Sequence, residues 1–307
     1  MPALTVRLIH RNDRDQLTEL VNQHVSAVVP GVSVSVNTVL SGLERQPDEF
    51  ITDPWVGERI TLVAEQCRSV VAAAHLLRYR ADTEVGEDYR DAGAIDWFVC
   101  RPPAASWPDS DEAAHLLMSA CLAQLARWNV RARYASGELP APVVYGLPRN
   151  WPHIRAVYER AGFRHVGDTE VILIARTVDL PANEPKPGVT IARTLGECGT
   201  RFTAYAEAHS VGFIEVDTAV TRAERHTRSA PLADVGNLHI APAHCGQGWE
   251  HRLLAQAGEW LRLCGVDRLV AYEAATDQTA IDQLRSAGFQ ELTRTDRRWE
   301  HRSQSPV

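Results

Sequence analysis

Residues 236–254 contain the side chains and glycines best suited to hold a phosphate group. A short apolar stretch with Leu238 and Ile240 runs into a loop that contains Gly246 and Gly248, and an amphipathic helical pattern follows. Glycines let a backbone turn sharply and approach a ligand closely. The first amides of a helix have no partner inside the helix, and the helix dipole adds partial positive charge there. The order of strand, glycine loop and helix start therefore predicts a phosphate-binding site.

Three carboxylates near this segment could remove a proton from a substrate. Asp234 precedes the apolar strand, and Glu215 and Asp217 lie on an earlier strand, where residues two apart share one face. The alternative for each is an ordinary solvated carboxylate on a loop or at a sheet edge. His239 alternates with its apolar neighbours, so it is either a base with a tunable pKa or a hydrogen-bonded core histidine.

Thiol and metal chemistry have weaker support. Cys245 lies just before the predicted helix start, where a thiol can acquire a lowered pKa. Because no partner base or acid is identifiable, a thiol enzyme is a third hypothesis only. His239, His244 and His251 do not have a familiar metal-ligand spacing, so no metal site is predicted. The six cysteines are scattered and form no Cys-x-x-Cys pair, which indicates reduced thiols in a cytoplasmic protein.

Length and composition are those of a globular protein with about two domains. The chain has 307 residues, of which 45% are hydrophobic and 23% charged, and a domain holds roughly 150 residues. The net charge of −7 argues against binding to nucleic acid or to an anionic membrane surface. No apolar run approaches the ~18 residues that span a bilayer, and the N-terminus reads as a strand instead of a signal peptide. We therefore expect a cytoplasmic protein.

A proline-rich segment divides the chain into two similar halves. Residues 179–188 contain three prolines and a glycine, which is typical of a semi-rigid linker and predicts domains at residues 1–180 and 188–307. Both halves open on a strand and later contain Ala-Gly-Phe, which ends at Phe163 in the first half and at Phe289 in the second. In each case the glycine ends a helical pattern and the phenylalanine starts a strand. Such self-similarity indicates duplication.

Hydrophobic periodicity places helices and strands in both halves. In the first half it predicts strands at 4–10, 60–65, 69–79, 94–100, 142–146 and 163–176 (with a break near Gly167) and helices at 13–28, 36–44, 111–128 and 152–161. In the second half it predicts strands at 190–193, 202–207, 211–216, 236–241, 268–273 and 289–299 and helices at 247–264 and 279–287. The second half lacks the first half's long helical pair, unless residues 195–199 keep one turn of it. The predicted class is α/β (α+β), with a mixed, mostly antiparallel sheet flanked by helices in each half.

The chain resembles the GNAT superfamily of acyl-CoA-dependent N-acyltransferases in a tandem, two-domain form. The superfamily's signature, Arg/Gln-x-x-Gly-x-Gly/Ala, corresponds to Cys245-Gly-Gln-Gly-Trp-Glu250. Residues 277–289 are similar to the superfamily's Asn-x-x-Ala…Tyr…Gly-Phe helix, and residues 150–163 are similar to it with one extra residue. The resemblance covers nearly the whole chain and implies a GNAT-like fold for each half.

The resemblance also implies that acyl-CoA, acetyl-CoA in the first place, binds to the second half. Pantetheine would lie between two splayed strands and bond to the backbone of one, while amides of the glycine loop would hold the pyrophosphate. This assigns cofactor binding to Leu238, His239, Ile240, Cys245, Gly246, Gln247, Gly248, Trp249, Glu250 and Asp277. An amine would attack the thioester after Asp234 or Glu215 removed its proton, and a tyrosine would protonate the thiolate. Tyr158 matches that tyrosine, with a core aromatic as its alternative.

The second half departs from the superfamily's pattern at four positions. Cys245 replaces Arg or Gln, and Leu284 stands at the tyrosine position. Glu250 replaces a small residue in the first helical turn, where a carboxylate satisfies the dipole itself and repels a phosphate. Glu250 therefore either turns outward and lets CoA bind, or occupies the anion site. Asp277 stands for the usual Asn and is equally well explained as a helix N-cap.

The first half has no glycine loop at the corresponding place. Residues 101–112 contain three prolines, which lack amide donors, together with Asp109, Asp111 and Glu112 at the helix start. A pyrophosphate is therefore not expected there.

Two hypotheses from different classes follow. The first is an N-acyltransferase that transfers an acyl group from acyl-CoA to a primary amine of a small molecule, without a metal, as a monomer or homodimer. The second is a catalytically degenerate protein of the same fold that binds a ligand or a partner. Glu250, Leu284 and the missing first loop favour the second hypothesis.

Overall fold

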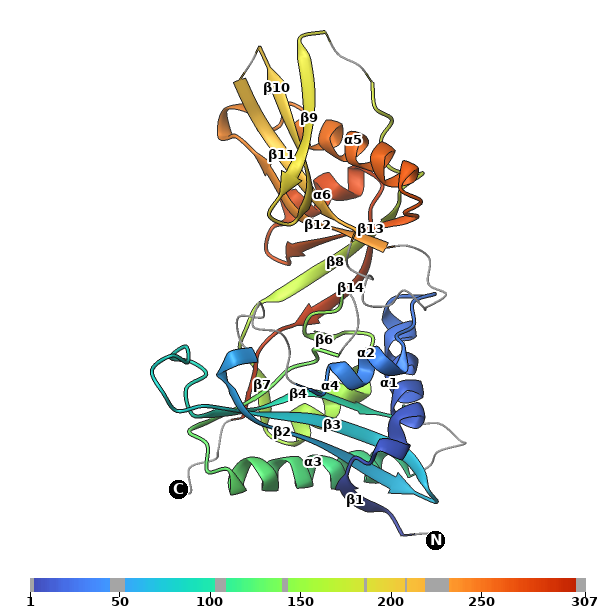
Figure 1. Cartoon of the computed structure of the whole chain (residues 1–307), viewed down its shortest axis with the longest axis vertical. Coiled ribbons are helices and arrows are strands. Elements are labelled where there is room, and N and C mark those ends of the chain that lie inside the picture. The colour runs from blue at the N-terminus through green and yellow to red at the C-terminus, as the bar shows by residue number, and fades with distance from the viewer. Residues whose placement is uncertain are drawn as a thin grey trace. The chain divides into compact units, whose positions relative to one another are not determined.

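The computed structural model describes residues 3–44, 53–102, 109–139, 143–184, 187–207, 209–218 and 232–301. The chain forms two compact units. The first contains Met1–Asp168 and Thr295–Val307, and the second contains Thr169–Arg294. Each unit is built around a mixed β-sheet with helices packed on it (Figure 1). The predicted fold class is confirmed.

The sheet of the first unit has the order β1-β2-β3-β4-β5-β15-β7. Neighbouring strands are antiparallel except β4 and β5, which are parallel. Helix α3 packs against β2, β3 and β4, and α1 packs against β3 and β4, so β3 is buried along most of its length. The elements are β1 (Thr5–Leu8), η1 (Arg11–Asp13), α1 (Arg14–Val28), α2 (Val36–Ser41), η2 (Asp53–Trp55), β2 (Val56–Gln66), β3 (Ser69–Tyr79), β4 (Ala92–Cys100), α3 (Ser110–Arg127), β5 (Ala132–Ala135), β6 (Leu147–Pro148), α4 (Pro152–Arg160), β7 (Phe163–His165) and β15 (Trp299–His301).

The sheet of the second unit has the order β14-β8-β13-β12-β11-β10-β9, and β6 pairs with the last two residues of β14. β12 and β13 are parallel, while β13 and β8, β11 and β12, and the hairpins of β9, β10 and β11 are antiparallel. The elements are β8 (Thr169–Arg176), β9 (Val189–Gly196), β10 (Gly199–Ala206), β11 (His209–Asp217), β12 (Leu232–Ile240), η4 (Pro242–His244), α5 (Trp249–Leu263), β13 (Arg268–Ala274), α6 (Gln278–Ser286) and β14 (Gln290–Asp296).

Each unit is completed by a strand from the other half of the sequence. β8 precedes the proline-rich segment, yet it pairs with β13 from Glu170 to Arg176. β15, near the C-terminus, pairs with β5 and β7. The compact units therefore do not coincide with the predicted domains 1–180 and 188–307, because these ladders place Thr169 in the second unit and Thr295 in the first.

Most predicted elements are present, but the predicted strand at 142–146 is wrong. Pro142 lies outside the described residues, and Val143 and Gly146 have positive φ values of 63° and 93°, which a strand does not accommodate. The strand beside β4 is instead β5, which has only four residues. Residues 195–199 contain no helical turn, because β9 and β10 form a tight hairpin there.

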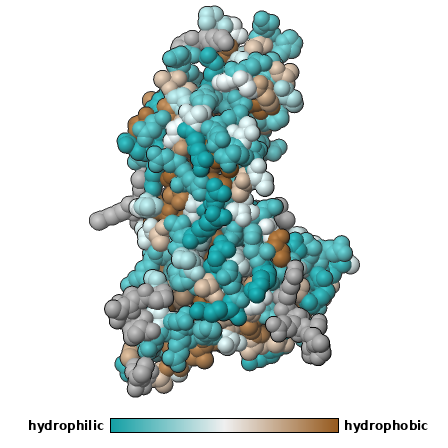
Figure 2. Space-filling model, turned by 180° about the vertical axis from the view of Figure 1, so that it is seen from behind, coloured by the Kyte–Doolittle hydropathy of each residue, from teal (hydrophilic) through white to brown (hydrophobic). Residues whose placement is uncertain are grey.

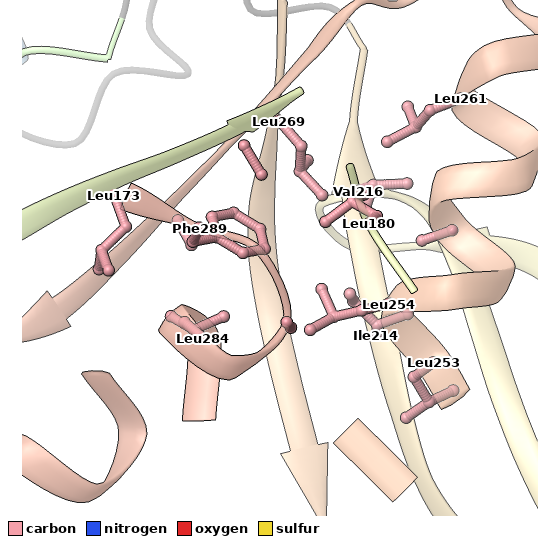
Figure 3. Close-up of a cluster of buried hydrophobic side chains, with 14 of the residues drawn as sticks. Leu173, Leu180, Ile214, Val216, Leu253, Leu254, Leu261, Leu269, Leu284 and Phe289 are labelled. Carbon is pink, nitrogen blue, oxygen red and sulfur yellow. The ribbon is translucent and has the colours of Figure 1, made fainter. Parts of the chain in front are cut away.

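Helices α5 and α6 cover one face of the second sheet. Figure 3 shows Leu253 and Leu254 of α5 and Leu284 of α6 in one cluster with side chains from the strands beneath them. Leu180, from the proline-rich segment, belongs to the same cluster. Outside, the face of the molecule in Figure 2 is mostly hydrophilic, with hydrophobic residues scattered among polar ones. This core fixes the strand, loop and helix that carry the predicted phosphate site.

Candidate active site

β12 and β13 separate partway along their length. They pair only at Leu232–Arg268, Ala233–Leu269 and Asp234–Val270. β12 then continues to Ile240 and β13 to Ala274 without further pairs in their register. The strands therefore open a gap toward their carboxyl ends, where the glycine loop and α5 follow.

A β-bulge lies where the gap opens. Glu215 pairs with Asn237 and Val216 with Val235, so Gly236 is an extra residue without a partner in the ladder. Bulges commonly occur next to active sites, where they leave backbone groups unpaired. A Cβ at position 236 would overlap the side chain of Cys198, which explains the glycine.

The gap contains a cavity of about 310 Å³. It is lined by Leu238, His239, Ile240, Cys245, Glu250, Leu254, Glu273, Asp277, Ala280, Gln283 and Leu284. β12, the glycine loop, α5, β13 and α6 all contribute to it. Six residues predicted to bind the cofactor line this cavity: Leu238, His239, Ile240, Cys245, Glu250 and Asp277.

The glycine loop is open where a ligand would approach. Gly246 has φ +73° and Gly248 has φ +79°, and apart from the adjacent residues no heavy atom in the described part of the chain lies within 4 Å of a Cβ built on either. Positive φ favours glycine, and the missing side chains leave the loop backbone accessible. α5 begins at Trp249, directly after Gly248, so the amides of its first turn lack helical partners at this place.

A second cavity of about 220 Å³ lies beside the loop. Gln247 and Gly248 line it with His251, Arg252 and residues 181–184. The guanidinium of Arg252 donates to the carbonyl of Glu184 over 3.3 Å. Arg252 was not among the predicted site residues, although its position in the first helical turn after Gly248 follows directly from the sequence. A cation there adds to the attraction of the helix start for a phosphate.

Trp249, which the resemblance assigned to cofactor binding, lies in the core. It is 6% exposed and belongs to the hydrophobic cluster under α5. Its ring meets His244 edge-on, with 6.4 Å between ring centroids. The loop is therefore anchored by a buried indole, while Gly246 and Gly248 remain open.

Three carboxylates line the first cavity. Glu250 lies in the first turn of α5, and no described residue pairs with its carboxylate. Asp277 accepts a hydrogen bond from the amide of Ala280 over 3.0 Å, so the helix N-cap predicted as its alternative is confirmed. Burial raises the pKa of Glu273, and the neighbouring Asp277 and Glu170 add to the shift. The cavity is thus acidic on the sides of α5 and α6.

Asp234 lies at the last paired position before the gap. Asp217 is its direct cross-strand neighbour, and the hydroxyl of Tyr272 donates to its Oδ2 over 3.5 Å. Burial raises the pKa of Asp234 to about 6, Asp217 adds to the shift, and the hydrogen bond from Tyr272 opposes it. A carboxylate with such a pKa is ionised near neutrality and basic enough to accept a proton from an ammonium group.

Asp234 and Tyr272 lie on the sheet face away from α5 and α6. Their strand neighbours Ala233 and Ala271 belong to the core under these helices, and side chains alternate along a strand. An acyl donor in the cavity and an acceptor at Asp234 would therefore reach the gap from opposite faces. Tyr272 was missed from the sequence, where it was one residue of a predicted strand.

Glu215 occupies a different environment from the one expected of a base. Its side chain is buried, and it accepts hydrogen bonds from the amides of Glu197 and Cys198 and from Arg201, which lies 2.6 Å away. Burial favours a higher pKa, but Arg201 and the two amides outweigh it and lower the pKa of Glu215. This carboxylate holds the turn between β9 and β10, and its acceptor capacity is already in use.

Tyr158 lies in the core of the first unit. It is fully buried between Phe98, Phe163 and Trp299, and its hydroxyl donates to the carbonyl of Ser136 over 2.5 Å. Burial raises the pKa of Tyr158 well above its usual range. The core aromatic predicted as its alternative is confirmed.

Two further candidates are accessible, and neither contacts an acidic or basic side chain among the described residues. His239 is exposed and lies 5.7 Å from the ring of Phe213, between centroids. Cys245 is exposed, and its thiol contacts the carbonyls of Ile240 and Ala241. Within the described ranges, no group of His, Cys, Asp and Glu side chains is placed to hold a metal ion. No described helix is both long and apolar enough to cross a bilayer.

Solved structures share this architecture over the whole chain. A tandem GNAT protein from the clavulanic acid biosynthesis pathway superposes with a TM-score of 0.61 at 14% identity, covering 99% of this chain and 100% of that one. The fold is that of a tandem GNAT protein. A GCN5-related N-acetyltransferase from Sphaerobacter thermophilus has a TM-score of 0.61 at 13% identity and covers 99% of this chain and 98% of its own.

A region of a longer protein has a similar fold. A GCN5-related glucosamine N-acetyltransferase region of a fungal multi-domain GH3 β-N-acetylglucosaminidase matches 98% of this chain with a TM-score of 0.59 at 12% identity. The chain spans 38% of that protein's length. No family model and no curated protein matches the sequence. Identities of 12–14% carry the fold alone.

Proposed function

We propose that the protein is an acyl-CoA-dependent N-acyltransferase whose second unit transfers an acyl group, acetyl in the first place, to a primary amine of a small molecule. The observation that carries this proposal is the separation of β12 from β13 after Asp234, which creates a cavity beside an open glycine loop. A carboxylate with a raised pKa lies at the point of separation.

The acyl donor would use backbone groups and one cation. Residues 235–240 of β12 have no partner in β13, so pantetheine can bond to their free edge as an added strand would. The amides at Gly248 and in the first turn of α5 would bind the pyrophosphate, with Arg252 as an added positive charge beside them. Leu238, Ile240 and Leu254 supply apolar wall for the pantetheine chain.

The residues at the gap supply the proton transfers. Asp234 takes a proton from the ammonium form of the acceptor, and the amine attacks the thioester carbon. The C–S bond then breaks, and the thiolate takes a proton from Tyr272, which recovers one from Asp234 through their hydrogen bond. The second proton of the nitrogen leaves to water. The products are an amide and free CoA.

The acceptor side favours a cationic amine. Asp217 and Asp234 face each other across β11 and β12 on the sheet face away from the helices. Two neighbouring carboxylates attract an ammonium group and raise the local concentration of its protonated form. Glu215 is left out of the mechanism because its carboxylate is committed to the β9–β10 turn.

Binding of acetyl-CoA tests the donor site first. Gly248→Ala places a methyl group in the open space of the loop and is expected to weaken acetyl-CoA binding about tenfold, measured by calorimetry. Gly265→Ala is the matched control, because Gly265 also has a positive φ (+72°) and no heavy atom within 4 Å of its Cβ position, but it lies at the end of α5. Equal affinity in both variants, or no binding to the wild type, contradicts the proposed donor site.

A second function is favoured by the acidic cavity and by Leu284 at the tyrosine position. In this alternative the second unit binds a ligand or partner without turnover. Release of free thiol from acetyl-CoA with a panel of amines separates the two, since binding without amine-dependent thiol release supports the alternative.

A further inference from the structure

The sheet of the second unit ends in an edge strand that is much longer than the other sheet edges. The two described sheets end in β1 and β7 and in β6 and β9, respectively. β1, β7 and β6 have four, three and two residues, whereas β9 has eight. An edge strand presents unpaired N–H and C=O groups to any further strand, so proteins usually keep free edges short or protect them. β9 is therefore the described edge best suited to receive another strand.

β9 also lacks the features that usually protect a free edge. Its one partner among the described strands is β10, and their ladder runs over all eight residues without a bulge. The strand contains no proline and a single charged residue, Arg193. Leu195 is 90% exposed, the largest exposed fraction among the large hydrophobic residues that the structure describes. A long, regular edge with an exposed leucine is typical of an interaction surface.

A groove of about 410 Å³ lies between β9 and α5. Ile191, Phe202 and Trp260 give it an apolar lining, and the rings of Phe202 and Trp260 meet edge-on with 5.7 Å between centroids. Arg193 and Glu259 add one charge of each sign to the same groove. Arg193 is exposed, so its guanidinium is accessible to another molecule. The groove and the strand edge form one continuous surface, because Ile191 and Arg193 belong to both.

We propose that β9 pairs in antiparallel orientation with β9 of a second copy of this chain, about a two-fold axis at Ala192. The sheets of the two second units would then join into one sheet. In this register Ile191 lies opposite the second copy's Arg193, and Val189 lies opposite the second copy's Leu195. This association is independent of the proposed acyl transfer, because no residue of β9 takes part in that reaction.

The charge pattern and the length of β9 select this register. A two-fold axis across the ladder places one residue opposite its own copy. An axis at Arg193 would set two guanidinium groups directly opposite each other, which is destabilising. An axis at Ile191 would place Leu195 beyond the start of the second copy's β9 at Val189. An axis at Ala192 avoids both and pairs every residue from Val189 to Leu195.

The same register makes the groove complementary to the second copy. Ile191 packs against the core beneath α5, so its alternate neighbours on β9 lie on the α5 side of the sheet. The second copy's Arg193, opposite Ile191, would therefore enter the groove that Glu259 lines. The symmetry repeats this arrangement, so each dimer gains two opposite-charge contacts, and both copies of Leu195 are covered by Val189. Such self-complementarity favours a second copy over an unrelated extended peptide.

Sedimentation of the full chain tests the association. Between roughly 1 and 100 µM the wild type is expected to shift from the mass of one chain to twice that mass. Hydrogen exchange is expected to show amides of β9 that become more protected as the concentration rises. A single-chain mass over the whole range overturns the proposal, and so does a dimer in which protection of β9 does not change with concentration.

A charge exchange tests the register. Arg193→Glu is expected to weaken the dimer at least about tenfold, because it places a carboxylate beside Glu259 of the other copy. Combining Arg193→Glu with Glu259→Arg is expected to restore the dimer, since both contacts are reversed in sign. Arg14→Glu, at an exposed position of α1 in the first unit, is the control for net charge. Thermal unfolding checks that each variant folds. A dimer that Arg193→Glu leaves unchanged, or that the double variant fails to restore, contradicts the interface.

Discussion

The parallel pair β4–β5 in the first unit and the parallel pair β12–β13 in the second begin with the same geometry but differ after their last paired residues. In both, a strand with a β-bulge runs parallel to a shorter neighbour. In the first unit the amide of Ser136 donates to Ile95 over 2.8 Å and that of Glu138 to Asp96 over 3.2 Å, so contact continues past the parallel pairs. In the second unit the pairing of β12 with β13 ends at Asp234, and a cavity follows.

The helices that follow β4 and β12 also differ, in what surrounds their first turns. α3 begins among acids that already have partners, since Asp109 accepts from Gln66 at 2.7 Å and Asp111 pairs with Arg160 at 2.6 Å. α5 begins after Gly248, with open space above the loop. At the helix start, the first copy of the fold has side chains that bond to one another, and the second copy has an open glycine loop. The two copies therefore share a fold but differ at the place where the proposed site lies.

The largest expected effect comes from Tyr158, whose hydroxyl bonds to the carbonyl of Ser136 directly after the last parallel pair of the first unit. Tyr158→Ala is expected to lower the free energy of unfolding by about 3–5 kcal/mol, because it leaves a large cavity in an aromatic core. Chemical denaturation measures the loss. Tyr158→Phe keeps the ring and is expected to lose only about 1–3 kcal/mol for the unpaired carbonyl of Ser136. Loss of amine-dependent thiol release in a stably folded Tyr158→Phe would instead place chemistry in the first unit.

Variants of Asp234 test whether this carboxylate is the base of the proposed reaction. With a pKa of about 6, Asp234 is ionised above that pH, so kcat/KM is expected to rise as pH increases through about 6. Asp234→Asn is expected to abolish this rise of kcat/KM with pH and to lower kcat/KM by about a hundredfold, which is the lower end of general-base effects.

Asp217→Asn is the companion variant. It removes the neighbouring negative charge that raises the pKa of Asp234, so the rise in kcat/KM is expected to move to lower pH. An unchanged pH profile in Asp234→Asn would exclude this carboxylate as the base.

The smallest expected effect comes from removing one carboxylate from the first turn of α5, with the same change in the first turn of α3 for comparison. Glu250→Gln removes a carboxylate from the first turn of α5, which is expected to cost about 0.3–1 kcal/mol of stability through the helix dipole. The same change is expected to raise affinity for acetyl-CoA about threefold at low salt, because it removes a charge that lines the cavity. Glu112→Gln in the first turn of α3 is the matched control, with a similar stability loss and no change in acetyl-CoA affinity. Equal affinities of wild type and Glu250→Gln would mean that Glu250 turns away from the ligand.

Much of the architecture was readable from the sequence, because long amphipathic helices and strands with clear ends carry strong local patterns. The helices at α3 and α5 and the break between β7 and β8 follow from periodicity and from Gly167. β5 was missed, because it has only four residues, one of them an arginine, and its pairing partner lies more than thirty positions away in the chain. The exchange of β8 and β15 between the halves was invisible for the same reason.

The sequence alone determined the duplication, the glycine loop and the acids that replace it in the first half, since each depends on residue types at short spacing. Only the tertiary structure decided which groups are available for chemistry. Glu215 and Asp234 are both strand carboxylates, yet one is bound by Arg201 and two amides and the other lies half-buried beside Asp217 and Tyr272. The pKa of a carboxyl group depends on burial and on neighbours in space, which residues far apart in the chain supply only after folding.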